Sequence, residues 1–298
     1  MTAQTAIEKS SPARRLLKQY LKNKMAVAGF IGLAAIIFVA VFAPVLSPQD
    51  PYDLAQLDIM DSLLKPGATS MDGVPYILGT DDQGRDILSG IMYGLRTSLG
   101  VGALSAFFAL IIGSALGLIS AFFGGRTDAV IMRVVDLQLS FPAILVALVL
   151  MAILGQGVDK IIIALIIVQW AYYARTIRSA ALVETQKEYI EAASCLALSN
   201  YRIVFRHLLP NCIPPMIVVV TVRVAAAISL EATLSFLGIG LPVTEPSLGL
   251  LISNGFEYML SGRYWISFYP GMALLFSIVS INLVGDHLRD ILNPRLQK

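Results

Sequence analysis

The chain has 298 residues, of which 56% are hydrophobic and only 14% charged, against about a quarter charged in soluble domains. A mean hydropathy of +0.74 is more than one soluble core could bury, which excludes an ordinary soluble protein. The 22 Lys and Arg nearly balance the 20 Asp and Glu, so there is no overall basic field for nucleic acid. Two cysteines and two histidines form no recognisable metal-ligand pattern, and we expect no metal site. A multi-span membrane protein is predicted.

Six stretches are apolar and approach the roughly 20 residues that a membrane-spanning helix needs. In chain order they run from Met25 to Leu46, Ser98 to Phe123, Val134 to Leu154, Ile161 to Ala181, Ile213 to Leu237 and Ile266 to Val284. The first is longer than the apolar core of a signal peptide and is followed by no cleavage pattern, so we expect it to be retained. Pro142 lies in the third stretch and should kink it. The predicted fold class is all-α, a polytopic membrane protein with six transmembrane helices.

The distribution of basic residues orients these helices, because Lys and Arg concentrate on the cytoplasmic side of a membrane protein. With the N-terminus inside, sixteen of the 22 basic residues are cytoplasmic and five are outside. The outer segment from Pro48 to Leu95 carries eight aspartates and two basic residues, a composition that a translocated loop tolerates. Both termini are therefore predicted to be cytoplasmic.

These assignments divide the chain into consecutive parts. They are a basic cytoplasmic arm (1–24), the first transmembrane helix (25–46), an acidic extracytoplasmic segment (47–96), a five-helix core (97–285) containing a long inner loop (184–211), and a cytoplasmic tail (286–298). Small residues at Gly113 and Gly117 predict a close contact between helices. No lysine follows a glycine, so the chain lacks a Walker A loop, and no hydrolase motif is present. We expect neither catalysis nor a bound cofactor in this chain.

The inner loop is much longer than the few residues that suffice to join two helices. Residues 188–193 have helical composition with acids in the first turn, and 201–209 predict a second helix that Pro210 stops. Such a helix pair could enter a groove on another protein through its small residues, while Arg202 and Arg206 meet an acidic rim. From the residues alone, an amphipathic pair lying on the membrane surface explains the pattern equally well.

The loop also resembles the EAA loop of ATP-binding-cassette (ABC) importer permeases. Glu-Ala-Ala at 191–193, Ala197, and His-Leu-Leu-Pro at 207–210 match its spacing, although Ala197 replaces the usual glycine and His207 the usual isoleucine. Because alanine favours helix over glycine by about 1 kcal/mol, we expect a less sharp bend at Ala197. The resemblance implies that the loop couples the chain to an ATPase. The residues implied are Glu188, Glu191, Ala192, Ala193, Ala197, Arg202, His207, Leu209 and Pro210. A bulky or charged residue at Ala193 or Ala197 should then uncouple ATP hydrolysis from transport.

Three further motifs resemble C-type permeases of dipeptide, oligopeptide and nickel importers, and the resemblance covers roughly residues 15–296. They are LGTDDQGRDILS at 78–89 with YGLRTSL at 93–99, EATLSFLGIG at 231–240, and NLVGDHLRD at 282–290 with NPR at 293–295. The resemblance implies a type I ABC importer permease fold in a bacterial inner membrane. The implied partners are a homologous second permease that completes a heterodimeric pathway, two cytoplasmic ATPase subunits that bind ATP and Mg, and an extracytoplasmic substrate-binding protein.

The cargo stays open at this stage. Di- or oligopeptides are favoured, and metal chelates such as nickel or opine complexes, or glutathione-like compounds, suit the same machinery. An autonomous secondary transporter is the competing class, and it would need charged relays in several spans. The sequence places few charges inside the membrane, which favours the ATP-driven importer.

Three of the charged residues inside the predicted spans are candidates for a pathway or structural role. Glu231 should be paired, protonated or facing a cavity, because an isolated charge in a bilayer is costly. A structural bond to another span or to a partner subunit is favoured over a role in lining or gating the pathway. Arg223 precedes Glu231 by eight residues, about 12 Å along a helix, so the two should not pair directly. Asp136 is expected to pair with Arg133 on the same helix face.

Overall fold

The computed structural model describes residues 20–51, 53, 57–70 and 73–292. Residues 1–19 of the predicted basic arm, Asp72 of the acidic segment and the 293–295 motif lie outside the described residues. The helices are α2 (Lys24–Val41), α3 (Ala43–Leu46), α4 (Ile87–Phe123), α5 (Gly125–Leu139), α6 (Ala143–Leu154), α7 (Val158–Thr185), α8 (Glu188–Cys195), α9 (Asn200–Arg202), α10 (Leu209–Phe236), α11 (Leu248–Phe256) and α12 (Trp265–Leu292).

Shorter elements lie between these helices. A π-helical turn, Ile203–Leu208, joins α9 to α10, and short 3-10 turns cover Ile59–Asp61 and Met259–Ser261. The strands β1 (Ala68–Thr69) and β2 (Pro75–Tyr76) form an antiparallel hairpin in the segment between α3 and α4, with Ala68 opposite Tyr76.

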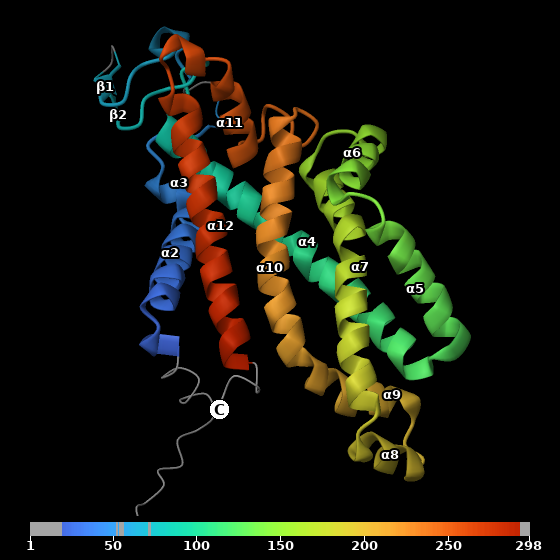
Figure 1. The fold of residues 1–298 in the computed structure, drawn as a ribbon. Helices are drawn as coiled ribbons and strands as arrows, with labels where there is room; N and C mark the ends of the chain where they lie inside the picture. The colour runs from blue at the N-terminus through green and yellow to red at the C-terminus, as the bar shows by residue number, and fades with distance from the viewer. Residues whose placement is uncertain (1–19, 52, 54–56, 71–72, 293–298) are drawn as a thin grey trace, which may run out of the picture.

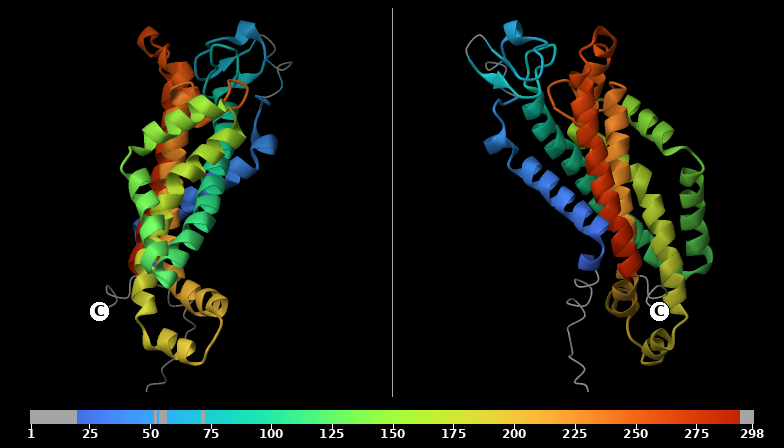
Figure 2. Two further views of the ribbon diagram at one scale, coloured as in Figure 1. Left: turned by 90° about the vertical axis from the view of Figure 1, so that its right-hand side faces the viewer. Right: turned by 60° about the vertical axis from the view of Figure 1, so that its left-hand side comes forward.

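The long helices form one elongated bundle (Figures 1 and 2). Within the described residues, five helices are long and apolar enough to cross a membrane, and there are six if the bent pair α5–α6 is one broken span. This agrees with the six spans predicted. The start of α2, the helix α8 and the end of α12 lie at one end of the bundle, here called the α8 end, whereas β1, β2 and α11 lie at the other, the α11 end (Figure 1).

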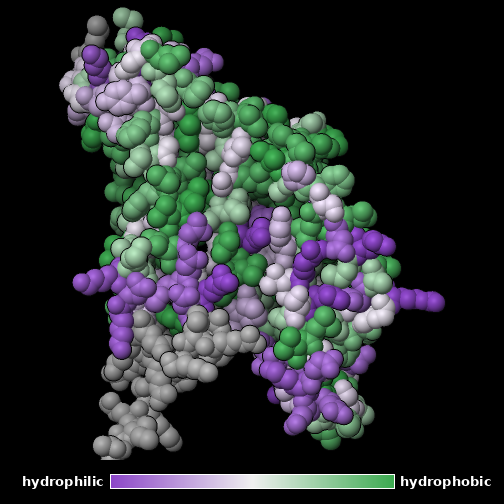
Figure 3. All heavy atoms as spheres, in the orientation of Figure 1, coloured by the Kyte–Doolittle hydropathy of each residue, from purple (hydrophilic) through white to green (hydrophobic). Residues whose placement is uncertain are grey.

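The side chains on the surface fit this arrangement. Hydrophobic residues cover much of the upper and middle part of the face in Figure 3, whereas hydrophilic residues gather around α8 and near the lower ends of α2 and α12. Many large hydrophobic side chains on the spanning helices are exposed, including Phe30, Phe107 and Ile153. Exposed apolar side chains along a helix bundle are expected where lipid or another subunit covers them.

The third span differs from its prediction as one helix from Val134 to Leu154. Two helices, α5 and α6, replace it, and their axes meet at 89°. Pro142 lies at the N-cap of α6, where it lacks an N–H to donate and disfavours helical geometry at the preceding residue. The bend expected at this proline is confirmed, but it breaks the helix instead of kinking it.

Two other helix boundaries differ from the predicted ones. Helix α4 begins at Ile87, eleven residues before the predicted Ser98, because the Asp86 carboxylate caps it by accepting a hydrogen bond from the Ser89 N–H at 2.9 Å. The last part of the predicted acidic outer segment is therefore helical. Helix α12 likewise continues to Leu292, so the described part of the predicted tail is also helical.

Helices α4 and α7 pack closely along most of their lengths. A methyl group on Gly113 would come within 2.5 Å of the Trp170 carbonyl oxygen, and one on Gly117 within 2.6 Å of the Ala174 carbonyl oxygen. Only glycine lets the two backbones approach this closely. The close helix contact predicted at these two glycines is confirmed.

Candidate functional site

The predicted inner loop lies at the α8 end and forms two helical pieces joined by a tight turn. Helix α8 ends in a Schellman motif, in which the Leu198 N–H donates to the Ala193 carbonyl at 3.3 Å and the Ala197 N–H to the Ser194 carbonyl at 3.0 Å. Ser199 then caps α9 by accepting a hydrogen bond from the Arg202 N–H. The predicted helix–turn–helix is confirmed.

Ala197 occupies the left-handed position of that turn, with φ of +50°. Glycine is the usual residue there because a Cβ makes this conformation less favourable by about 1 kcal/mol. The prediction that alanine would make the bend less sharp is wrong, since the hydrogen bonds of the Schellman motif hold the alanine in the glycine-like conformation.

Glu184, at the end of α7, holds α8 in place and was not singled out from the sequence. Its carboxylate accepts hydrogen bonds from Lys187 Nζ and from the Tyr189 hydroxyl, each at 2.6 Å. Desolvation and the hydrogen bond to Glu184 raise the pKa of Tyr189 to about 12, so the hydroxyl remains a donor at neutral pH. These bonds fix the angle between α7 and α8.

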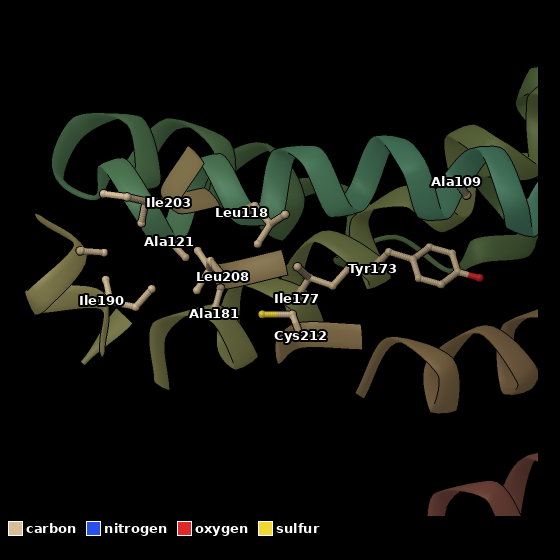
Figure 4. Packing of buried hydrophobic residues seen from close by; sticks show 11 residues of the cluster. Ala109, Leu118, Ala121, Tyr173, Ile177, Ala181, Ile190, Ile203, Leu208 and Cys212 are labelled. Atoms are coloured by element: carbon tan, nitrogen blue, oxygen red, sulfur yellow. The ribbon is translucent and has the colours of Figure 1, made fainter. Parts of the chain in front are cut away.

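The buried side of the loop packs onto the ends of α4 and α7 (Figure 4). Ile190 and Ala193 of α8 join Ile203 and Leu208 in one hydrophobic cluster with residues of α4 and α7. Ala193 is 5% exposed and faces its own chain. A charged residue at this position would therefore disrupt the seat of α8 on the bundle, in addition to any effect on a contact with another protein.

The opposite side of the loop exposes large apolar side chains. Leu196 and Tyr201 are each 74% exposed and Phe205 is 52% exposed, and the two aromatic rings pack with centroids 4.5 Å apart. We call Leu196, Tyr201 and Phe205 the apolar loop face. Apolar residues clustered on a polar loop are typical of a protein–protein interface. The i, i+4 spacing of the two aromatics on a short helix was the available sequence signal, and it was missed.

Pro210 does not stop the second helix, contrary to the prediction. The helix continues without a break from α9 through the π-helical turn into α10, and the whole run from Asn200 to Phe236 is one candidate span. In the π-helical turn the Leu209 N–H donates to the Val204 carbonyl, five residues back. This wider turn places Pro210 in the first turn of α10, where a proline is tolerated.

The other residues predicted to couple the loop to an ATPase are placed as follows. Exposed positions are Glu188, Glu191, Ala192, Ala197, Arg202 and Pro210, and half-buried positions are His207 and Leu209. All of them belong to one compact surface at the α8 end, so the structure brings the predicted set together, with Ala193 on its buried side.

Glu231 lies near the other end of α10 and is completely buried. The Ser98 hydroxyl of α4 donates to its carboxyl group at 2.7 Å, the Ser235 hydroxyl donates at 2.8 Å, and Ser247, the N-cap of α11, also hydrogen-bonds to it. The carboxyl group therefore ties α4, α10 and α11 together. The predicted structural bond to another span is present.

Arg223 and Asp136 have different partners from those considered in the sequence. The Arg223 guanidinium lies over the Tyr172 ring of α7, 3.6 Å from its centroid, and does not pair with Glu231, as predicted. Asp136 pairs with Arg175 of α7, so the predicted pair with Arg133 is wrong. A long side chain on the neighbouring helix reaches the carboxylate, and the pair ties α5 to α7.

Within the described residues, no three His, Cys, Asp or Glu side chains come together in a way that could hold a metal ion. Cys195 of α8 is exposed and Cys212 is buried. The α8 end presents apolar and charged side chains on short, well-anchored helices.

Comparison with known proteins agrees with this geometry. Residues 113–298 match the family described as binding-protein-dependent transport system inner membrane component, and residues 11–66 match the N-terminal TM domain of oligopeptide transport permease C. The chain is 36% identical over 288 residues to the di/tripeptide transport system permease protein DppC of Pseudomonas aeruginosa, covering 96% of this chain and 93% of the relative. It is 38% identical over 289 residues to the dipeptide transport system permease protein DppC of Escherichia coli K12, covering 97% and 95%.

The fold also matches a solved permease. An inward-facing structure of the MetNI methionine ABC transporter superposes with a TM-score of 0.56 at 20% sequence identity, over 70% of this chain and 98% of that chain. A second crystal form of the same transporter gives a TM-score of 0.58 at 18% identity, with the same coverage. These matches support the type I importer permease fold. The chain is a multi-pass inner-membrane protein that belongs to the family of binding-protein-dependent transport system inner membrane components.

Proposed function

We propose that this chain is the permease subunit of an ATP-driven importer of di- or oligopeptides. The relatives that match over nearly its full length are named as dipeptide or di/tripeptide permeases, which favours peptides over metal chelates or glutathione-like cargo. It would form half of a heterodimeric pathway with a homologous second permease. The chain itself would catalyse no reaction, because ATP and Mg would be bound by two cytoplasmic ATPase subunits.

The observation that carries this proposal is the apolar loop face on an anchored loop at the α8 end. Leu196, Tyr201 and Phe205 would be buried against an ATPase subunit, and Glu191 and Arg202 at the rim would set its orientation. The same end holds the start of α2 and the end of α12, and most basic residues of the sequence assign to it. We therefore place the α8 end and both termini in the cytoplasm.

The proposed mechanism is alternating access driven from this loop. When the ATPase subunits close on ATP, they would move α8, and the hydrophobic cluster beneath it would pass that displacement to the ends of α4 and α7. A packed cluster transmits motion because it cannot be compressed. The Glu184 bonds keep α8 at a fixed angle to α7, so the displacement would become a rotation of the spans. The substrate-binding protein would deliver cargo at the α11 end.

The test is purification of the tagged chain in mild detergent, followed by reconstitution in proteoliposomes with the binding protein. We expect a homologous permease and two ATPase subunits to co-purify, and ATP-dependent uptake of labelled dialanine. A Tyr201→Ser, Phe205→Ser variant should lose the ATPase subunits, whereas Gln186→Ser, an exposed residue outside the apolar loop face, should retain them. Recovery of a stable chain alone that takes up peptide without ATP would contradict the proposal.

A further inference from the structure

Arg223 is a charged residue halfway along α10, inside the fifth predicted span. Its guanidinium lies over Tyr172, which follows the start of α7 by 14 residues and precedes its end by 13, about 20 Å in each direction. In the orientation of Figure 1, hydrophilic spheres interrupt the hydrophobic surface at mid-height over α10 and beside α7 (Figure 3). A cation at this depth faces a partner group or a water-filled passage, because lipid alone cannot solvate it.

No negative group within the described part of the chain compensates this charge. Arg223 takes part in none of the ion pairs, and its Nε atom is buried without a hydrogen-bond partner. The two carboxyl groups predicted inside the spans are engaged elsewhere, since Asp136 pairs with Arg175 and Glu231 is bound by serine hydroxyls. The ring of Tyr172 stabilises the cation without neutralising it.

Further unpartnered polar groups lie on the adjoining face of α7. Tyr173 and Gln169, four residues apart and 0% and 3% exposed, have a hydroxyl group and a side-chain amide without hydrogen-bond partners. Arg223 lies close enough to Tyr173 to interact with it electrostatically. Buried polar groups are usually satisfied, so a group of them beside an unpaired cation indicates a place where a polar ligand or water enters.

We propose that Arg223, held against Tyr172, is a transit site for a carboxylate group of the cargo inside the translocation pathway. Stacking fixes the plane of the guanidinium, whose two terminal Nη groups have the geometry to bind both oxygens of a carboxylate. Every linear peptide with a free C-terminus carries such a group, so the assignment of the carboxylate to a peptide rests on the proposed function. One cation with a few neutral donors binds an anion and still releases it, as conduction through a membrane requires.

The alternative partner of Arg223 is a carboxylate of the second permease. Two experiments separate this alternative from a carboxylate of the cargo. The first experiment places a reporter cysteine at Ala226, an exposed residue one helical turn from Arg223, in a Cys195→Ser, Cys212→Ala background. In the assembled transporter, the rate of thiol modification is measured with a sulfonate methanethiosulfonate reagent and with its trimethylammonium analogue. The ratio of the anionic to the cationic reaction rate reports the electrostatic potential in the water around the reporter thiol.

Arg223→Gln should lower the anionic-to-cationic rate ratio at Ala226→Cys by about tenfold, the effect of about 1.4 kcal/mol in local potential, and Arg223→Lys should keep most of it. A control reporter at Leu260, fully exposed at the α11 end, should show no change. An unchanged ratio, or a reporter that reacts with neither reagent because the second permease covers it, would overturn the proposal. This readout holds whether or not the cargo is a peptide.

The second experiment measures ATP-dependent uptake of dialanine by the same variants. Arg223→Gln should lower uptake about tenfold, with partial recovery in Arg223→Lys, while both variants co-purify normally with all partners. Loss of the second permease from the Arg223→Gln complex would show that the arginine pairs with that subunit and would overturn the transit site. If the wild type imports no dialanine but the rate ratio falls as expected, the peptide assignment fails and the anion site stands.

Discussion

The two ends of the bundle satisfy their polar and apolar groups in different ways. At the α11 end, Glu231 is buried with hydroxyl donors from three elements, and Gly94 of α4 packs against the backbone of Ser247 and Leu248. At the α8 end, short helices rest on one hydrophobic cluster, and the apolar loop face remains exposed. The α11 end is therefore held together by buried hydrogen bonds and close backbone contacts, whereas the α8 end is held mainly by hydrophobic packing and exposes an apolar face.

This difference indicates where motion would start and where it would stop. Close backbone contacts and a buried hydrogen-bonded carboxyl group resist displacement of α4, α10 and α11 relative to one another. Near the α8 end, Pro210, Pro214 and Pro215 each lack the N–H of a regular helix, and a π-helical turn precedes them. Helices bend most readily at such places. We expect the first turns of α10 to deform more easily than its end at Glu231.

The largest loss of stability should come from removing the hydrogen bonds of Glu231 at the α11 end. Glu231→Ala removes the shared acceptor of three serine hydroxyls and leaves a cavity, and we expect it to destabilise the fold by about 3 kcal/mol. Glu231→Gln keeps one acceptor oxygen and should cost only about 1 kcal/mol. Thermal denaturation of the purified chain in detergent measures both. Equal denaturation temperatures for the wild type and Glu231→Ala would show that the hydrogen bonds do not hold this end.

The next effect concerns the contact between α4 and α7 that connects the two ends. Gly113→Ala places a methyl group against the Trp170 carbonyl and the Tyr173 side chain, and should cost about 1 to 3 kcal/mol. Gly100→Ala is the matched control on the same helix, because nothing lies within 4 Å of its Cβ position. It should stabilise the helix by about 0.5 to 1 kcal/mol. The same denaturation assay compares them, and destabilisation by both would refute close packing as the cause.

A change of opposite sign is expected at the α8 end. Ala197→Gly relieves the left-handed alanine and should stabilise the turn after α8 by about 1 kcal/mol. Hydrogen exchange of the α8 amides should then slow several-fold. Ala192→Gly, an exposed position in the middle of α8, should accelerate it by a similar factor, because glycine lowers helix stability. Faster exchange in both variants would mean that the Schellman motif does not determine the turn.

The smallest expected effect is a pH dependence in the segment between α3 and α4. The Asp81 carboxylate accepts hydrogen bonds from the Gln83 and Arg85 N–H groups at 2.8 and 2.9 Å, but its other oxygen is buried without a partner. Burial raises the pKa of Asp81 above 3.8, and the two backbone hydrogen bonds only partly offset this. The folded form therefore holds its proton more strongly than the unfolded form.

It follows that the stability contributed by Asp81 is present at low pH and is lost as the pH rises from about 3.8 through the raised pKa. Asp81→Asn should flatten this part of the pH profile of thermal denaturation. Glu257→Gln, an exposed carboxyl in the same outer region, should leave the profile unchanged. A profile in Asp81→Asn identical to that of the wild type would show that another group causes the dependence.

Much of the fold was predictable from the sequence because long apolar stretches in a bilayer can only be helices. The six spans and the glycine contact between α4 and α7 followed from composition and spacing. The break at Pro142 was only partly predictable, since a proline indicates a bend but its angle depends on what packs around it. The prediction that Pro210 ends the helix was wrong because a π-helical turn places this proline in the first turn of α10.

The candidate surface at the α8 end was predictable as a segment but not in its orientation. The motif from 188 to 210 located the loop, yet which of its residues face outward depends on how α8 rotates about its axis. Ala193 faces inward, and the exposed Tyr201 and Phe205 are not positions of the motif and have only their i, i+4 spacing as a signal. The partners of Asp136 and Arg223 lie on α7, far away in sequence, so spacing along one helix could not identify them.

The central claim is that ATPase subunits cover the α8 end, and the chain contains its own reporter for it. Cys195 is exposed at the end of α8, beside Leu196, whereas Cys212 is buried beneath the loop. Maleimide labelling is measured in inside-out vesicles before and after the ATPase subunits are stripped off. We predict that Cys195 labels at least about tenfold faster in stripped vesicles and that Cys212 stays unlabelled in both. Equal labelling of Cys195 with and without the ATPase subunits would contradict the account.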